Sequence, residues 1–286
     1  MTHTLTRRLV LGTALASALP AAAQSPPAIF RQGLIFVRIR LDETEGLFML
    51  DTGAQATAID SHFAARTRLH LGRPVELEGR GGYAGARWSP GLTLNLGAAT
   101  GRVDAVVADL GDEGRAMGVP LDGILGEDFL RRFIVTLDYG RQTVALVPPE
   151  AAAAPPADAA PLRFNVLPYV RARVSRAGHS VDAEFQVDTG SNTAVEFWGP
   201  FAQQAFPGAR GAPGIGMGVA GDASILRGRI DSLQVAGRQS GPLVVNLADE
   251  TRPNGAGADY AGVIGGPAWA GLALTLDVPR GKLWVR

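Results

Sequence analysis

The sequence predicts an all-β protein, mainly strands with short helices, that is built from two similar lobes. Three observations predict it: short runs of Val, Leu, Ile and Phe between glycine-containing turns, one proline- and alanine-rich segment near the middle, and several elements that occur twice in the same order. The chain has 286 residues, enough for two lobes of ordinary size, and its apolar content of 46% can supply a core to each.

Composition and charge exclude several classes of partner. The formal net charge is zero, so nothing favours nucleic acid or an anionic membrane surface. The absence of cysteine removes disulfides, thiolate nucleophiles and cysteine metal sites. Three histidines show no metal-ligand spacing, and they are His62, His70 and His179. We therefore expect neither a metal nor another cofactor.

The N-terminal segment 1–23 has the features of an export signal. Arg7 and Arg8 precede an apolar run at 9–19, and an A-x-A site predicts cleavage after residue 23. The apolar run is too short to span a bilayer comfortably. The arginine pair fits a twin-arginine signal as well as an ordinary secretory one, and both routes stay open. We expect the mature chain to be periplasmic or secreted, with no integral membrane association.

A proline- and alanine-rich segment at 148–161 divides the chain. It reads PPEAAAAPPADAAP, a composition typical of an extended, semi-rigid linker. We therefore expect an N-terminal lobe at 28–147 and a C-terminal lobe at 162–286.

Helical pattern is brief in both lobes. Residues 60–69 predict one short helix, and Asp128 predicts the N-cap of another that continues to Phe133. Asp138 and Asp277 each end a Thr-Leu-Asp sequence, and we interpret them as turn residues at strand ends.

The two lobes repeat the same elements in the same order, which indicates an internal duplication. The repeated elements are a strand (34–40 and 167–173), an Asp-Thr-Gly turn (51–53 and 188–190), a Gly-x-Ala-Gly segment (82–85 and 218–221) and the end of each lobe (122–147 and 261–286). The copies are 137 residues apart at the acidic turn and 139 apart at the last element.

The duplication gives the two acidic turns a chemical meaning. Two copies of one lobe about a pseudo-two-fold axis would bring Asp51 and Asp188 together. Like charges at close range raise one pKa, so the pair would share a proton and offer an acid and a base at once. Such a pair can activate water against a peptide bond without metal or cofactor. The apolar segments 124–126 and 263–265, each ending in Gly, suit packing beneath these turns.

The neighbours of the two acids predict support for them. Gly53 and Gly190 allow tight turns that direct backbone N–H groups at the carboxylates. Thr52 and Thr189 can hydrogen-bond across to the opposite loop and fix the separation of the acids. Ser191 follows the second turn, and its hydroxyl can lower the pKa of the neighbouring acid by donating to it. We then expect the acid of the first turn to carry the shared proton.

A glycine-rich segment of the first lobe predicts a hairpin over the site. Its residues Gly82, Tyr83, Ala84 and Gly85 suit a mobile flap that closes over substrate and excludes water, with Tyr83 facing the substrate.

These motifs together resemble the aspartic protease superfamily, both pepsin-like and retroviral-type. The resemblance is carried by two apolar residues before Asp-Thr-Gly-Ala/Ser, followed by two apolar residues and Gly, each found twice. The form GILGEDFL and the small lobes look most like bacterial retropepsin-like proteases. The resemblance covers residues 29–286 and implies a bilobal acid-protease fold, a peptide or protein substrate, Asp51 and Asp188 as the catalytic pair, and Tyr83 on a flap.

The sequence also departs from both branches of that superfamily. Retroviral-type enzymes pair two chains, whereas here the lobes are fused, so we expect a monomer with an intramolecular site. Pepsin-like enzymes are longer and often carry disulfides. In the second lobe, Val219 stands where the first lobe has Tyr83.

Three other interpretations fit parts of the pattern. The acidic turns could be purely structural features of a duplicated β protein. Two Asp-x-Gly loops also occur in actin-type kinases and ATPases, but that fold needs long helices, and few are predicted here. A catalytically silent relative could bind peptides between its lobes, because fold does not fix function. A protease would turn over a peptide, whereas the silent relative would only bind it stoichiometrically, so a cleavage assay distinguishes the two.

Overall fold

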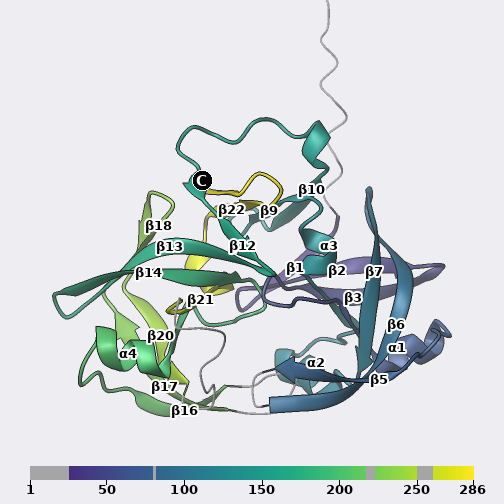
Figure 1. Cartoon of the computed structure of the whole chain (residues 1–286), viewed down its shortest axis with the longest axis horizontal. Coiled ribbons are helices and arrows are strands. Elements are labelled where there is room, and N and C mark those ends of the chain that lie inside the picture. Colours follow the sequence, from purple (N-terminus) through teal and green to yellow (C-terminus); the bar gives the residue numbers. More distant parts are fainter. Residues whose placement is uncertain (1–25, 80–81, 217–222, 250–259) are drawn as a thin grey trace, which may run out of the picture.

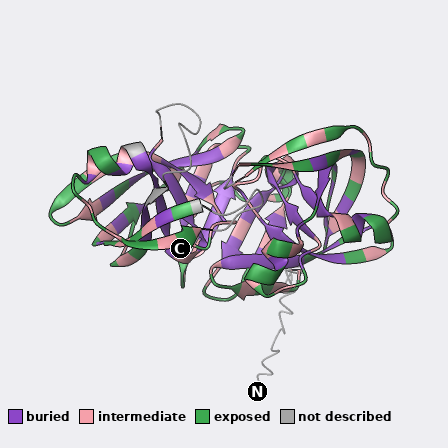
Figure 2. Ribbon diagram, turned by 90° about the horizontal axis from the view of Figure 1, so that it is seen from below, coloured by how far each residue is buried: buried purple, intermediate pink, exposed green. Residues whose placement is uncertain are grey.

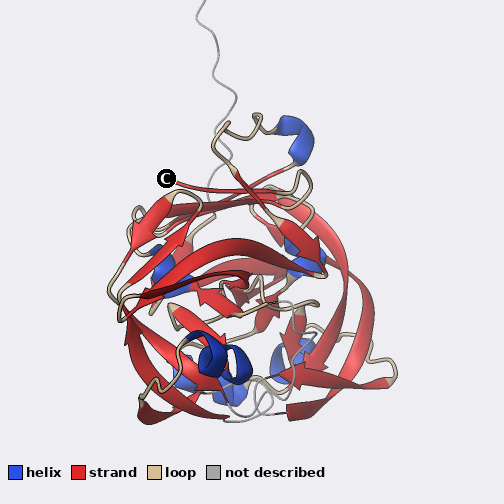
Figure 3. Cartoon of the chain, turned by 60° about the vertical axis from the view of Figure 1, so that its left-hand side comes forward, coloured by secondary structure: helices blue, strands red, loops and turns tan. Residues whose placement is uncertain are grey.

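A computed structural model describes residues 26–79, 82–216, 223–249 and 260–286. Two predicted features, the signal at 1–23 and the second-lobe hairpin segment at 218–221, lie outside the described residues. The described chain is mostly strand with a few short helices (Figure 3), which confirms the predicted all-β fold class.

The first lobe is organised around an eight-stranded sheet. Its strands are β1 (Ala28–Arg31), β2 (Leu34–Leu41), β3 (Thr44–Leu50), β4 (Ala58–Asp60), β5 (Pro74–Gly79), β6 (Gly82–Leu96), β7 (Ala99–Ala108) and β8 (Gly123–Leu125). They lie in the order β1-β2-β3-β8-β4-β7-β6-β5. The helices of this lobe are α1 (Ser61–Arg66), α2 (Gly111–Met117) and α3 (Glu127–Leu130).

The second lobe is organised around a ten-stranded sheet. Its strands are β12 (Arg163–Asn165), β13 (Leu167–Arg176), β14 (His179–Asp188), β15 (Val195–Trp198), β16 (Ala212–Gly216), β17 (Ala223–Ile230), β18 (Ser232–Val235), β19 (Arg238–Ser240), β20 (Leu243–Asp249) and β21 (Gly262–Gly265). The main path runs β16-β17-β20-β15-β21-β14-β13-β18-β19, and β12 pairs with β13. The helix α4 (Gly199–Ala205) and the 3-10 turn η2 (Gly266–Trp269) complete the lobe.

A third, five-stranded sheet joins the lobes and lies at the top of Figure 1. Its strands are β9 (Ile134–Asp138), β10 (Thr143–Val147), β11 (Ala160–Pro161), β22 (Ala273–Asp277) and β23 (Lys282–Val285), in the order β10-β9-β22-β23-β11. The central pair is β9 with β22, in which Thr136 lies opposite Thr275 and the two hydroxyls are 2.9 Å apart. One hydrogen-bonded sheet therefore contains strands from both halves of the chain.

Each lobe has its own apolar core, and Figure 2 shows buried residues in both halves of the molecule. The shared sheet contributes to both cores. Val135 and Leu137 of β9 pack into the first-lobe core, whereas Leu274 and Leu276 of β22 pack into the second. Tyr139, the residue that follows β9, packs against both cores. The burial of these side chains stabilises the arrangement of the lobes as well as the sheet itself.

Strand pairing around the two acidic turns is alike in the two lobes. β3 pairs in parallel with β8, and β14 pairs in parallel with β21. Each acidic turn follows directly on the first strand of its pair, so the backbone of the neighbouring strand lies beside the acid. The local setting of the two acids is therefore built in the same way twice.

The helix predicted at 60–69 begins as expected but is shorter. Asp60 is its N-cap and accepts hydrogen bonds from the backbone N–H groups of His62 (2.9 Å) and Phe63 (3.2 Å). The helix ends at Arg66, because Arg68 adopts a left-handed backbone with φ 55° that an α-helix cannot contain.

The prediction that Asp128 caps a helix reaching Phe133 is wrong. The helix α3 covers only Glu127–Leu130, and its N-cap is Gly126, which makes no side-chain capping bond. The Asp128 carboxylate instead accepts hydrogen bonds from the N–H (3.0 Å) and hydroxyl (2.7 Å) of Thr57. Thr57, which is distant in sequence, offers two donors to this carboxylate, and these bonds replace the predicted bond to the N-terminus of the helix.

The residues Asp138 and Asp277 are strand-end turn residues, as predicted. Asp138 ends β9 and accepts a hydrogen bond from the N–H of Arg141 at 2.7 Å. Asp277 ends β22 and accepts from the N–H of Arg280 at 3.0 Å. In both turns the arginine side chain also pairs with the carboxylate, at 3.1 Å.

The segment predicted as a linker, 148–161, leads from one outermost strand of the shared sheet, β10, to the other, β11. It contains a 3-10 turn, η1 (Pro149–Ala151), and ends in β11, which pairs with β23. The guanidinium of Arg280 donates to the carbonyl oxygens of Pro149 (2.6 Å) and Ala153 (2.9 Å). These bonds fasten the segment to the turn between β22 and β23.

Candidate active site

The two Asp-Thr-Gly turns lie where β3 and β14 end. The N–H of Asp51 donates to the carbonyl of Leu125 in β8 at 3.0 Å. Asp188 lies in register with Gly265 of β21. The apolar-apolar-Gly strands therefore lie directly beside the strands that carry the acids, and they fix where each carboxylate emerges.

Thr52 and Thr189 bind the two turns to each other by reciprocal hydrogen bonds. The N–H of Thr52 donates to Oγ1 of Thr189, and the N–H of Thr189 donates to Oγ1 of Thr52, both at 3.1 Å. The Thr52 hydroxyl donates to the carbonyl of Val187 (2.7 Å), and the Thr189 hydroxyl donates to that of Leu50 (2.9 Å). Both threonines are buried. Four buried hydrogen bonds thus set the distance between the two turns.

The glycines of the turns bring each loop against the opposite acid. A Cβ added at Gly53 would collide with the Asp188 carboxylate, and one added at Gly190 would collide with that of Asp51. Each glycine N–H also donates to the acid of its own turn, at 2.7 Å for Gly53 and 3.0 Å for Gly190. Only glycine leaves room for the two acids to meet.

The two carboxyl groups contact each other and are only partly exposed. Burial and then the charge of Asp188 raise the pKa of Asp51 well above its ordinary value, while the N–H of Gly53 lowers it. A hydrogen bond between the two carboxyls adds to the increase. The pair therefore holds a proton at a pH at which an isolated aspartic acid is ionised.

The two turns differ in the residue that follows them. Ala54 follows the first turn, and Ser191 follows the second, where its hydroxyl accepts a hydrogen bond from the N–H of Thr193 at 3.3 Å. The expectation that Ser191 lowers the pKa of Asp188 stays a prediction. The raised pKa of Asp51 agrees in direction with a proton carried on the first turn.

The predicted flap residues lie in a hairpin formed by β5 and β6. Gly82 and Tyr83 begin β6, with Tyr83 opposite Glu78 of β5 and 68% exposed. Ala84 and Gly85 continue the strand. In the second lobe β16 and β17 form a similar hairpin, and both hairpins lie toward the edge of Figure 1 opposite the shared sheet.

Two buried groups near the acids escaped the sequence reasoning. Glu127 follows Gly126 and is 2% exposed. Tyr139 has a buried hydroxyl without a hydrogen-bond partner among the described residues. The sequence does contain a signal for Glu127. The two repeated lobe ends, 122–147 and 261–286, are otherwise similar, but the second has Gly266 at the position of Glu127. For Tyr139 we find no signal in the sequence.

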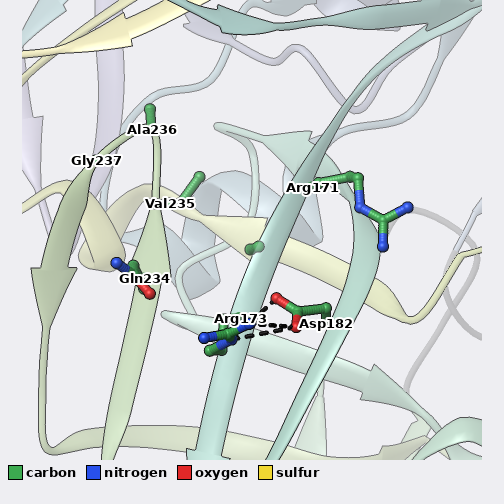
Figure 4. A pocket seen from close by; sticks show the side chains of 8 residues that line it. Arg171, Arg173, Asp182, Gln234, Val235, Ala236 and Gly237 are labelled. Carbon is green, nitrogen blue, oxygen red and sulfur yellow. Dashed lines mark hydrogen bonds and ion pairs between the residues drawn. The ribbon is translucent and has the colours of Figure 1, made fainter. Parts of the chain in front are cut away.

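Three further properties of the described residues bear on other kinds of site. Within the described ranges, no three His, Asp or Glu side chains gather as a metal ion would require. No helix in the same ranges combines the length and apolar content needed to cross a membrane. A shallow depression on the second lobe (Figure 4) is lined mainly by residues of β13 and β18, and Arg173 pairs there with Asp182 at 2.7 Å. None of the residues around the two acids lines it.

The hydroxyl of Thr52 should contribute strongly to stability. We expect Thr52→Val to lower the free energy of unfolding by about 2–4 kcal/mol, because it leaves the buried N–H of Thr189 and carbonyl of Val187 without partners. Thr52→Ser keeps the hydroxyl and should lose much less. Urea unfolding followed by circular dichroism measures both. Equal losses in the two variants would contradict a role for the hydroxyl, because Thr52→Ser keeps both of its hydrogen bonds.

Residues 37–129 match the family model described as aspartyl protease. The matched segment begins in β2, ends within α3, and includes the first acidic turn with Asp51. No curated protein matches the chain. The family match supports assignment of the chain to the aspartic protease superfamily, with general aspartic protease function.

Proposed function

We propose that the protein is an aspartic endopeptidase that hydrolyses peptide bonds with a water molecule activated between Asp51 and Asp188. One observation carries the proposal: reciprocal bonds between Thr52 and Thr189 hold the two acidic turns together, and the two carboxyls contact each other. Because the acids come from different lobes of one chain, we further propose that a monomer contains the complete site.

In the proposed reaction the two acids have complementary roles. The ionised carboxylate takes a proton from water as the water oxygen attacks the carbonyl carbon of the peptide bond. The protonated carboxyl gives its proton to the carbonyl oxygen, which yields a tetrahedral diol. The diol collapses when a proton passes to the nitrogen, and the C–N bond breaks. The raised pKa of Asp51 favours Asp51 as the proton donor in the free enzyme.

Extended peptides are the substrates that this arrangement favours. Edge strands of hairpins can hydrogen-bond to the backbone of an extended chain over several residues. Tyr83 on the first hairpin and Ile215 on the second are large apolar side chains that are 68% and 64% exposed. A bound peptide that covers these side chains removes apolar surface from water, which stabilises the complex.

Incubation with a diverse peptide mixture tests the proposal. The protein should cleave internal peptide bonds between acidic and neutral pH, as read by mass spectrometry. The double variant Asp51→Asn/Asp188→Asn should cleave at least about 10²-fold more slowly, and it controls for contaminating proteases. Binding of peptides by the wild type without any cleavage at any pH would identify a catalytically silent peptide-binding protein and refute the endopeptidase.

A further inference from the structure

We propose that Glu127 is a positioning residue that acts through Asp51, in that its carboxyl helps the Asp51–Asp188 pair to keep the shared proton as pH rises. The inference rests on the proposed function, because it assigns Glu127 a role in the reaction of that pair. Glu127 itself is not proposed to touch the substrate.

The backbone of Glu127 is attached to the loop that carries Asp51. Its N–H donates to the carbonyl of Ala54 at 2.8 Å, three residues after Asp51. Two residues before Glu127, the carbonyl of Leu125 accepts the N–H of Asp51 itself at 3.0 Å. The first acidic turn is thus bonded to the chain on both sides of Gly126, and the position of Glu127 relative to Asp51 is fixed by backbone rather than by side-chain contacts.

The side chain of Glu127 is enclosed. It is 2% exposed, and its Oε2 has no hydrogen-bond partner among the described residues. The charged groups that act on it are Asp51 from the neighbouring loop, Arg131 at the C-cap of α3, and Asp128 within α3. Burial first, and then the charge of Asp51, raise the pKa of Glu127 to about 8, against the opposing effect of Arg131. Glu127 therefore carries a proton of its own through the acidic and neutral range.

The second lobe has no equivalent carboxyl. The position that corresponds to Glu127 is Gly266, where an added Cβ would collide with the carbonyl of Gly33 and lie 3.2 Å from the Tyr139 hydroxyl. That hydroxyl occupies the space instead, and burial together with the charge of Asp188 raises its pKa well above the ordinary value. Each acid thus has a buried O–H group nearby, but only the one beside Asp51 ionises near neutral pH.

Coupling between two titrating groups is reciprocal. Because the charge of Asp51 disfavours ionisation of Glu127, a charge on Glu127 must in turn disfavour ionisation of Asp51. As pH approaches the pKa of Glu127, negative charge builds up beside Asp51 and opposes loss of the proton that the pair shares. The pair then remains singly protonated, as the proposed reaction requires, to a higher pH than two aspartates alone would.

Carboxyl titrations of the full chain by carbon-13 NMR test the coupling without any need for activity. In the wild type Glu127 should titrate near pH 8, and in Asp51→Asn its pKa should fall. In Glu127→Gln the pKa of Asp51 should fall in turn. Identical pKa values for Glu127 in the wild type and in a folded Asp51→Asn variant would overturn the proposal.

The pH profile of kcat/KM tests the consequence for catalysis. In Glu127→Gln the alkaline limb should move to lower pH by roughly half a unit, which lowers the activity retained at high pH about threefold. Glu113→Gln is the matched control, because Glu113 likewise has a buried carboxyl oxygen without a hydrogen-bond partner among the described residues, but it is less buried and lies on α2. An alkaline limb that stays in place in Glu127→Gln refutes the role of Glu127. Absence of peptide cleavage by the wild type refutes the proposed function alone, since the NMR titrations still report the coupling.

Discussion

Asp51→Asn and Asp188→Asn should each reduce kcat/KM for peptide hydrolysis by roughly 10²–10⁴-fold, the range expected for loss of a positioned general acid or base. Asparagine can neither accept a proton from water nor deliver one to the carbonyl oxygen. Because the two carboxyls act as one unit, the double variant should be little worse than either single variant. Steady-state cleavage of one peptide from the mixture, measured for all three variants, checks both expectations.

The fold should survive these substitutions, which makes the result interpretable. Asparagine has nearly the shape of aspartic acid, and its side-chain oxygen can still accept the N–H of Gly53 or Gly190. The bonds between Thr52 and Thr189 do not involve the acids and should persist. Circular dichroism and urea unfolding serve as controls. A folded single variant that retains wild-type turnover would contradict the two-acid mechanism.

Much of the fold could be predicted, because its signals are local and repeated. Alternating apolar strands and glycine turns predict the all-β class without knowledge of long-range contacts. The cross-loop bonds of Thr52 and Thr189 could also be anticipated, because a hydroxyl stands next to the acid in both copies of the turn. Where both partners of a contact lie in copies of one repeated motif, the contact can be predicted from the sequence alone.

Predictions that depended on a distant partner were less successful. Asp128 has the local sequence of a helix cap, yet Thr57, 71 residues earlier, provides two donors to the same oxygen. A helix start rich in acids is also typical of a solvent-exposed first turn, since the helix dipole favours negative charge there. Glu127 therefore looks ordinary in sequence. Its burial depends on the long-range attachment of the start of α3 to the first acidic loop, where the N–H of Glu127 donates to the carbonyl of Ala54, and no local pattern contains that contact.

The enclosed carboxyl of Glu127 should make stability depend on pH in a way that Glu127→Gln removes. The unfolded chain loses this proton near the ordinary value of 4.5, whereas the folded chain keeps it up to about pH 8. Between these values the folded state binds more protons than the unfolded state, so the contribution of Glu127 to stability falls as pH rises. Each unit of pKa shift corresponds to about 1.4 kcal/mol, which gives at most about 5 kcal/mol over the interval.

Urea unfolding of the wild type and of Glu127→Gln at a series of pH values between 4.5 and 8 measures this effect. The difference in unfolding free energy between the two should shift in favour of the variant as pH rises. Burial of the glutamine amide adds an offset that does not depend on pH, so the slope isolates the titration of Glu127. Glu43→Gln, which removes one exposed carboxyl from the turn between β2 and β3, is the control. A difference that stays constant across the interval would show that Glu127 ionises alike in the folded and unfolded chain, and that its enclosure has no electrostatic cost.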